Sequence, residues 1–219
     1  MPFSAYVQAG LFVVAAAAAM FAAAGTVAIP GFWAYLAIFA AVMTISFATL
    51  DSDLLRERMR PGGKKPPLAL RLYSLVLFVH WIVAGLDRGH FHWSDNVPVW
   101  LQGVGLFAVA AGFGLALWAM RVNRFFSSVI RIQTDRGQQV VTTGPYAFVR
   151  HPGYTAGILI IVASGPALGS WLAAALLVIF SLPFLLHRAV TEDRILQAEL
   201  AGYSDYAARV RWRLLPGIW

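Results

Sequence analysis

Apolar residues fill most of the chain in long stretches that contain no Asp, Glu, Lys or Arg. These stretches run over Met1–Leu50, Leu72–Leu86, Asn96–Met120 and His151–His187. A helix that spans a bilayer needs about 20 predominantly apolar residues. The pattern therefore predicts an all-α, polytopic integral membrane protein.

Proline and glycine divide the longest of these stretches. Pro30-Gly31 is typical of a tight turn between two helices, and Gly165-Pro166 with Gly169 predicts a short helical hairpin. We expect about five or six transmembrane helices, the last two forming this hairpin, followed by a cytoplasmic extension. The predicted helices are about Ala9–Ile29, Phe32–Leu50, Leu72–Leu86, Asn96–Met120, Gly153–Ser164 and Ser170–His187.

The basic residues predict the orientation, because cytoplasmic loops of membrane proteins collect Lys and Arg. With the loop Arg56–Lys65 in the cytoplasm, alternation of the helices leaves only Arg88 of the 17 basic residues on the other side. Both termini are then cytoplasmic. The pattern also divides the chain into an N-terminal four-helix membrane region, 1–120, and a C-terminal catalytic region, 121–219, made of a cytoplasmic linker, the hairpin and an amphipathic tail.

Composition excludes several classes of protein. Hydrophobic residues make up 59% and charged residues 12% of the chain, against about 25% charged in soluble domains, so a soluble enzyme and a disordered chain are both excluded. There is no cysteine, hence no disulfide or thiolate chemistry. The net charge of +7 is explained by anchoring to an anionic leaflet, without a nucleic acid partner. His80 is the one ionisable residue near the middle of a predicted helix, which disfavours an ion-coupled transporter.

Polar residues gather in two stretches that flank the predicted hairpin, 121–154 and 187–219. The hairpin brings them together, so we expect an active site at the cytoplasmic membrane surface. Pro152 suits the first position of a helix, whose free N–H groups, beside Arg150 and His151, would attract an anion. Equally, Arg150 could extend to lipid headgroups and His151 could cap the helix.

The second polar stretch continues the last helix out of the membrane. Glu192 and Asp193 are adjacent and diverge by about 100° on a helix, so at most one of them faces the anion site. Glu192 could instead pair with Arg188 one turn earlier. In the outer loop, His90 and His92 lack a third ligand at a metal-binding spacing, and we predict no metal site.

One run of residues in the C-terminal region resembles the isoprenylcysteine carboxyl methyltransferase family and its phospholipid methyltransferase relatives. It begins with Gly144-Pro145-Tyr146, continues with Arg150-His151-Pro152-Gly153-Tyr154 and Gly157, and then includes Glu192-Asp193, Gly202-Tyr203, Tyr206, Val210 and Pro216. The resemblance covers about 121–219 and leaves the first four helices unmatched.

The resemblance implies an integral membrane enzyme that uses S-adenosylmethionine and methylates a lipophilic substrate entering from the bilayer. It places His151, Tyr154 and Gly157 at the cofactor site, Tyr146 nearby, and Glu192 as the first acid of a pair. Asp193 stands where the family usually has a second glutamate. The predicted cofactor-binding residues are Tyr146, His151, Pro152, Tyr154, Gly157, Glu192, Asp193, Tyr203 and Tyr206, and the predicted catalytic residues are Arg150 and Glu192.

These residues suit the chemistry of the cofactor. His151 and the helix N-terminus could take its carboxylate, Glu192 its amine or ribose, and the tyrosines its sulfonium by cation–π contact. Carboxyl O-methylation of an isoprenylcysteine-like acceptor is favoured and would use Arg150 to hold the acceptor.

Other functions remain open. Phospholipid amine N-methylation would need a base, for which Glu192, Asp193 and Asp205 are candidates. An NADPH-dependent membrane reductase could bind the cofactor phosphates at Arg209, Arg211 and Arg213. A lipid-binding or transport module would use the polar stretches only as interfacial anchors.

Overall fold

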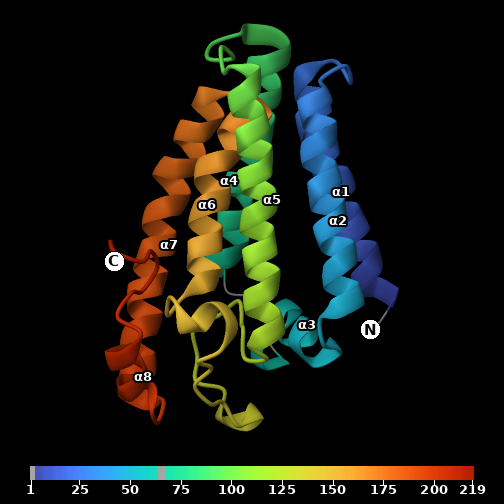
Figure 1. Ribbon diagram of the computed structural model, residues 1–219. Helices are drawn as coiled ribbons and strands as arrows, with labels where there is room; N and C mark the ends of the chain where they lie inside the picture. The colour runs from blue at the N-terminus through green and yellow to red at the C-terminus, as the bar shows by residue number, and fades with distance from the viewer. Residues whose placement is uncertain (1–2, 64–67) are drawn as a thin grey trace.

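The computed structural model describes residues 3–63 and 68–219 and is helical throughout the long apolar stretches (Figure 1). Lys64 and Lys65 of the predicted basic loop lie outside the described residues. The long helices are α1 (Phe3–Ala24), α2 (Pro30–Thr49), α4 (Leu68–Leu86), α5 (Val99–Val122), α6 (Pro152–Leu168) and α7 (Trp171–Glu199). The short helices are α3 (Ser52–Met59) and α8 (Tyr203–Arg209), with η1 (Pro61–Gly63), η2 (Asp87–Phe91), η3 (Thr134–Arg136) and η4 (Gly144–Ala147) between the longer ones.

Among the described residues, α1, α2, α5 and α7 are long and apolar enough to cross a membrane, and α6 is a shorter apolar helix of 17 residues. The chain is thus an integral membrane protein. The total of five or six spans stays a prediction. α7 has 29 residues and measures roughly 44 Å at 1.5 Å per residue. Because this exceeds a hydrocarbon core of about 30 Å, one end of α7 extends beyond it.

The predicted helix boundaries were wrong at two turns. α1 ends at Ala24 rather than near Ile29, because Gly25 adopts a positive φ of 67°, and Pro30 begins α2 instead of breaking it. α6 continues past Ser164 and Pro166 to Leu168, where Gly169 ends it with φ 78°. Gly165 serves packing here, since a Cβ at this position would lie 2.3 Å from the Ala174 Cα. The hairpin itself is confirmed.

Close packing joins α5 to the hairpin. Of the four glycines in α5, a Cβ at Gly105 would lie 2.6 Å from the Ala167 nitrogen, and a Cβ at Gly112 would lie 2.7 Å from Ile160. Gly103 and Gly114 have open space around them. Small residues let helices approach in a membrane, and only two of these glycines are used in that way.

The core between the helices is apolar and aromatic, and a chain of hydrogen bonds centred on His80 crosses it. His80 is fully buried, with Nδ1 2.9 Å from the Ala173 carbonyl oxygen and Nε2 2.8 Å from the Ser164 hydroxyl. Ser164 in turn lies 2.7 Å from the Tyr35 hydroxyl. His80 is therefore a paired core residue that joins α4, α6 and α7.

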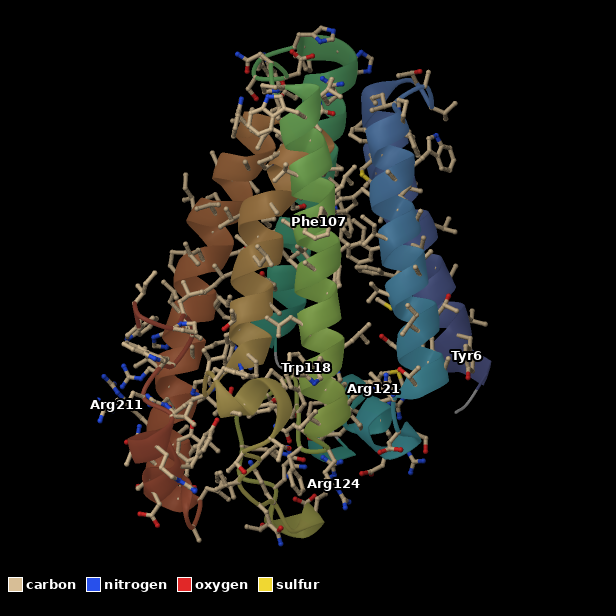
Figure 2. All side chains as sticks on the ribbon, in the orientation of Figure 1. Tyr6, Phe107, Trp118, Arg121, Arg124 and Arg211 are labelled. Carbon is tan, nitrogen blue, oxygen red and sulfur yellow. The ribbon has the colours of Figure 1, made fainter. Side chains whose placement is uncertain are left out.

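Polar side chains lie at both ends of the bundle, and we call one of these ends the basic end (Figure 1). It contains α3, the linker between α5 and α6, and α8. Figure 2 shows Arg121, Arg124 and Arg211 at this end. The two polar stretches that flank the hairpin, 121–154 and 187–219, lie at this end (Figure 1). The side of the membrane that this end occupies stays a prediction.

Candidate active site

Asp193 lies at the centre of the polar contacts that join the start of α6 to the end of the chain. Its carboxylate is fully buried. Oδ1 accepts hydrogen bonds from Arg150 Nε at 2.9 Å and from the Tyr203 hydroxyl at 3.0 Å, and lies 3.0 Å from His151 Nε2. Oδ2 accepts from Arg150, Gln197 and Arg213 at 3.1, 2.8 and 2.9 Å. We call Arg150, His151, Asp193, Tyr203 and Arg213 the Asp193 cluster.

The C-terminal segment is bound to the same place through its main chain. The Arg150 and His151 backbone N–H groups donate to the Trp212 and Arg213 carbonyl oxygens, each at 2.9 Å. Arg150 Nη1 donates to the Val210 and Arg211 carbonyl oxygens, each at 3.0 Å. Arg150 is therefore occupied by Asp193 and the chain end, and it does not line the cavity described next.

A cavity of about 710 Å³ lies beside the Asp193 cluster at the basic end. Polar side chains from η4, from the residue before α6, and from α6, α7 and α8 line it, and we call them the polar wall; apolar side chains of α2, α5 and α7 that also line it are called the apolar wall. The linker covers it with residues 125–133 and 138–141. The polar wall includes Tyr146, His151, Tyr154, Arg188, Glu192, Tyr203 and Tyr206, and the apolar wall includes Val42, Met43, Phe47, Phe113, Ala116 and Phe184.

Glu192 and Tyr154 meet on the polar wall. The Tyr154 hydroxyl donates to Glu192 Oε2 at 2.6 Å, and the ring of His151 lies 5.8 Å from the ring of Tyr154. Arg188, one helical turn before Glu192, also lines the cavity and donates from Nη2 to the Ser128 carbonyl oxygen at 3.0 Å. The lining of the cavity thus contains a carboxylate, an imidazole and the guanidinium of Arg188, and Arg58 and Arg131 line it as well.

The tyrosines of the wall are neutral hydrogen-bond donors. Burial, reinforced by the charge of Asp193, raises the pKa of Tyr203, and burial likewise raises the pKa of Tyr206 and of Tyr146. The Tyr206 hydroxyl donates to the Tyr146 carbonyl oxygen at 2.7 Å, and Asn123 Nδ2 donates to the Tyr146 hydroxyl oxygen at 3.0 Å. These bonds fix the aromatic rings against α5 and α8.

The predicted cofactor residues divide into two groups. Tyr146, His151, Tyr154, Gly157, Glu192, Tyr203 and Tyr206 line the cavity, whereas Pro152 and Asp193 are buried beside it. Gly157 packs closely, since a Cβ there would lie 3.1 Å from Leu185. His151 and Glu192 line the same cavity, although the direct partner of His151 is Asp193.

Sequence reasoning missed two parts of the site. Arg188 was considered only as an ion-pair partner of Glu192, although its spacing of four residues places it on the same helix face. Arg213 was grouped with its basic neighbours, but it bonds Asp193. No local pattern distinguishes Arg213 from Arg209 and Arg211. Among the described residues, no group of three or more His, Asp or Glu side chains is placed to hold a metal ion.

Comparison with protein families finds a match that includes part of this site. Residues 104–198 match the model of the isoprenylcysteine carboxyl methyltransferase family. This part of the chain, which includes α6, Glu192 and Asp193, is similar to that family, and the resemblance noted in the sequence is confirmed. The family is one of membrane methyltransferases.

Two curated relatives carry other names. The chain is 31% identical over 164 residues to the nickel-cobalt-cadmium resistance protein NccN of Alcaligenes xylosoxydans xylosoxydans, a match that covers 73% of this chain and 65% of the relative. It is 30% identical over 135 residues to the cobalt-zinc-cadmium resistance protein CzcN of Cupriavidus metallidurans, covering 60% of this chain and 57% of the relative. The chain thus spans less than two thirds of either relative.

Proposed function

We propose that this protein transfers a methyl group from S-adenosylmethionine to a lipophilic, membrane-borne acceptor. The observation that carries the proposal is the cavity, which is lined both by Glu192, Tyr154 and His151 and by apolar side chains of the membrane helices. A charged cofactor fits the polar wall, and an acyl or prenyl chain fits the apolar wall. The family match of residues 104–198 supports the same reaction class.

The residues of the polar wall suit the groups of the cofactor. Because His151 Nε2 donates to the Asp193 carboxylate, Nδ1 is the ring atom that is left to bond a ligand group such as a ribose hydroxyl. Glu192 can bind the same kinds of donor. The rings of Tyr146 and Tyr154 offer π-faces to a sulfonium.

The methyl group on the sulfonium of S-adenosylmethionine is the electrophile that the bound cofactor supplies. A nucleophile of the acceptor donates its electron pair to the methyl carbon, and the bond between carbon and sulfur breaks with its electrons staying on sulfur. The protein then has to align the acceptor in line with that bond. The linker, which covers the cavity, also helps to exclude water.

The acceptor class we favour is a carboxylate, as in an isoprenylcysteine-like lipid. A carboxylate is ionised at neutral pH and needs a cation to orient it. We propose that Arg188, which lines the cavity one helical turn before Glu192, provides this cation. Arg150 then acts as a positioning residue, since its guanidinium is occupied by Asp193 and by main-chain oxygens.

The arrangement does not favour the reductase. Arg209 and Arg211 do not line the cavity, and Arg213 is bound to Asp193. The extra phosphates of NADPH would therefore lack the basic cluster that the sequence suggested for them.

The test is transfer of a labelled methyl group from S-adenosylmethionine into a lipid extract by the purified protein in nanodiscs. We expect label in a base-labile ester of a lipophilic acid, with competition by S-adenosylhomocysteine and none by NADPH. Label in a phospholipid headgroup would replace the acceptor class by an amine. Absence of transfer together with absence of saturable S-adenosylhomocysteine binding would reject the proposal. Calorimetric titration with Co²⁺, Ni²⁺ and Cd²⁺ is the control for direct metal binding, because the two relatives are named for resistance to such metals.

A further inference from the structure

The C-terminal segment 209–219 carries exposed apolar and basic side chains on the surface that faces away from the site. Ile218 is 77% exposed, Trp212 39% and Leu215 38%. Arg209 and Arg211 are exposed beside them. The inward side chains of the same segment are Arg213, which bonds Asp193, and Leu214, which is buried. The segment is thus fixed on one face, whereas on the other face its side chains are exposed among the described residues, with a bond from Arg209 Nε to the Asp205 carbonyl oxygen at 3.4 Å.

The position of the segment matches a membrane surface. In Figure 1 the chain turns back after α8, and its end lies beside α7, closer to the middle of the bundle than α8 does. Figure 2 shows Arg211 pointing away from the bundle at about the height of Arg121, which belongs to the last turn of α5. Arg211 therefore lies level with the last turn of α5 (Figure 2), and the end of the segment lies closer to the middle of the bundle (Figure 1).

The charges identify the kind of surface. Arg209 and Arg211 are exposed cations, and the acid nearest to them in sequence, Asp205, lies one turn earlier on α8. Tryptophan beside arginine is typical of the interface between headgroups and acyl chains. Each basic residue near an anionic leaflet raises the binding constant of a segment for that leaflet by about fivefold.

We propose that the segment 209–219 docks on an anionic membrane surface and that this contact holds the Asp193 cluster in place. The cluster depends on the segment through the bonds of Arg150 and His151 to the Trp212 and Arg213 carbonyl oxygens, and through the 2.7 Å bond from Thr155 Oγ1 to the Leu214 carbonyl oxygen. Anionic lipid therefore strengthens cofactor binding at His151, a consequence that rests on the function proposed above.

The first measurement follows the segment itself. The chain has no cysteine, so Ile218→Cys provides a single thiol for an environment-sensitive fluorophore. In nanodiscs that contain phosphatidylglycerol, we expect the label to be quenched by a lipid-borne quencher, and less so in phosphatidylcholine alone. Arg209→Gln with Arg211→Gln should lower the ratio of inserted to exposed label by roughly fivefold per arginine. Ser204→Cys on α8 is the control position, which should stay accessible to iodide in both lipids.

The second measurement follows the site. The affinity for S-adenosylhomocysteine should be higher in the anionic discs. The increase should not exceed the increase in the ratio of inserted to exposed label, because docking of the segment cannot contribute more than its own free energy. The double arginine variant should lose this lipid dependence, whereas Arg56→Gln with Arg121→Gln, which removes the same charge elsewhere, should retain it. A label that stays in water in anionic discs, or an affinity that ignores lipid charge while the label inserts, would overturn the inference. Insertion without any binding of the analogue would reject the proposed function and leave the membrane contact standing.

Discussion

Replacement of Asp193 by Asn is the most direct test of the Asp193 cluster. The carboxylate is fully buried and accepts from two nitrogens of Arg150 at 2.9 and 3.1 Å, while Arg213 and Tyr203 donate to it as well. An amide has one acceptor oxygen in place of two and no charge. Removing one partner of a buried ion pair costs about 3–5 kcal/mol, because the other charge is left uncompensated.

We therefore expect Asp193→Asn to lower the free energy of unfolding by about 3–5 kcal/mol. The assay is reversible unfolding in mixed micelles of a mild detergent and sodium dodecyl sulfate, followed by circular dichroism. Asp193→Glu keeps the charge but adds a methylene to a filled site, which costs about 1–3 kcal/mol. The expected order of stability is thus wild type, then the glutamate variant, then the asparagine variant.

The neighbouring acid provides the matched control. Glu192 is half-buried and bonds Tyr154 on the cavity wall. Glu192→Gln should leave the stability within about 0.5 kcal/mol of wild type and weaken S-adenosylhomocysteine binding by roughly 10–100-fold. If Asp193→Asn unfolds at the same detergent fraction as wild type, the ion pair with Arg150 does not hold the chain end, and the division of roles between the two acids is wrong.

Three further changes test other parts of the structure. Tyr154→Phe removes the hydroxyl that donates to Glu192 and should weaken binding of the cofactor analogue by about 3–10-fold in calorimetry, with unchanged stability; a wild-type affinity would contradict the place of Tyr154 in the site. Gly105→Ala should destabilise the bundle by about 1–3 kcal/mol, since the new methyl would lie 2.6 Å from the Ala167 nitrogen, whereas Gly103→Ala, with open space, should be neutral or stabilising; equal midpoints of unfolding would refute the close contact of α5 and α6. Burial alone would raise the pKa of Glu57, but hydrogen bonds from Arg131, the Gly62 N–H and Ser127 together lower it. The stabilisation of the contact between α3 and the linker is therefore fully present above the ordinary pKa of glutamate. It is lost as the pH falls through the lowered pKa. Hydrogen exchange of the Ser127 and Arg131 amides should therefore rise at acid pH relative to a neutral reference corrected for intrinsic rates, and Glu57→Gln should abolish the change.

Much of the fold could be predicted from the sequence because it depends on local properties of the chain. Uncharged runs of suitable length give the helices, and Pro152 marks the start of α6 as expected. The ends of the helices were harder to predict, because a proline is compatible with the first turn of a helix and also with its last turn. Pro30 begins α2. Pro166 lies within the last turn of α6, where Gly165 packs against Ala174.

The linker was the least predictable part. Its only regular elements are the short turns η3 and η4, yet it covers the cavity through contacts distant in sequence. Arg131 donates to Glu57 of α3 at 3.1 Å, and Ser127 donates to the same carboxylate at 3.0 Å. Arg136 reaches Asp53 of α3 at 2.6 Å. Such pairs are set by the path of the chain between helices, and no periodic pattern records them.

The two adjacent acids show how a local rule and a tertiary contact combine. Helix geometry requires Glu192 and Asp193 to point about 100° apart, so the sequence already indicates that they serve different surroundings. It does not indicate which acid faces the ligand, because that depends on where the chain end returns. In the structure Arg213 and Arg150 reach Asp193 from the side of the C-terminal segment, which leaves Glu192 toward Tyr154 and the cavity. A carboxylate held by two arginines suits a fixed support better than a changing ligand. The same argument explains why a shorter acid fits at 193, where the cluster closes tightly, and a longer one at 192, where the side chain has to reach into open space.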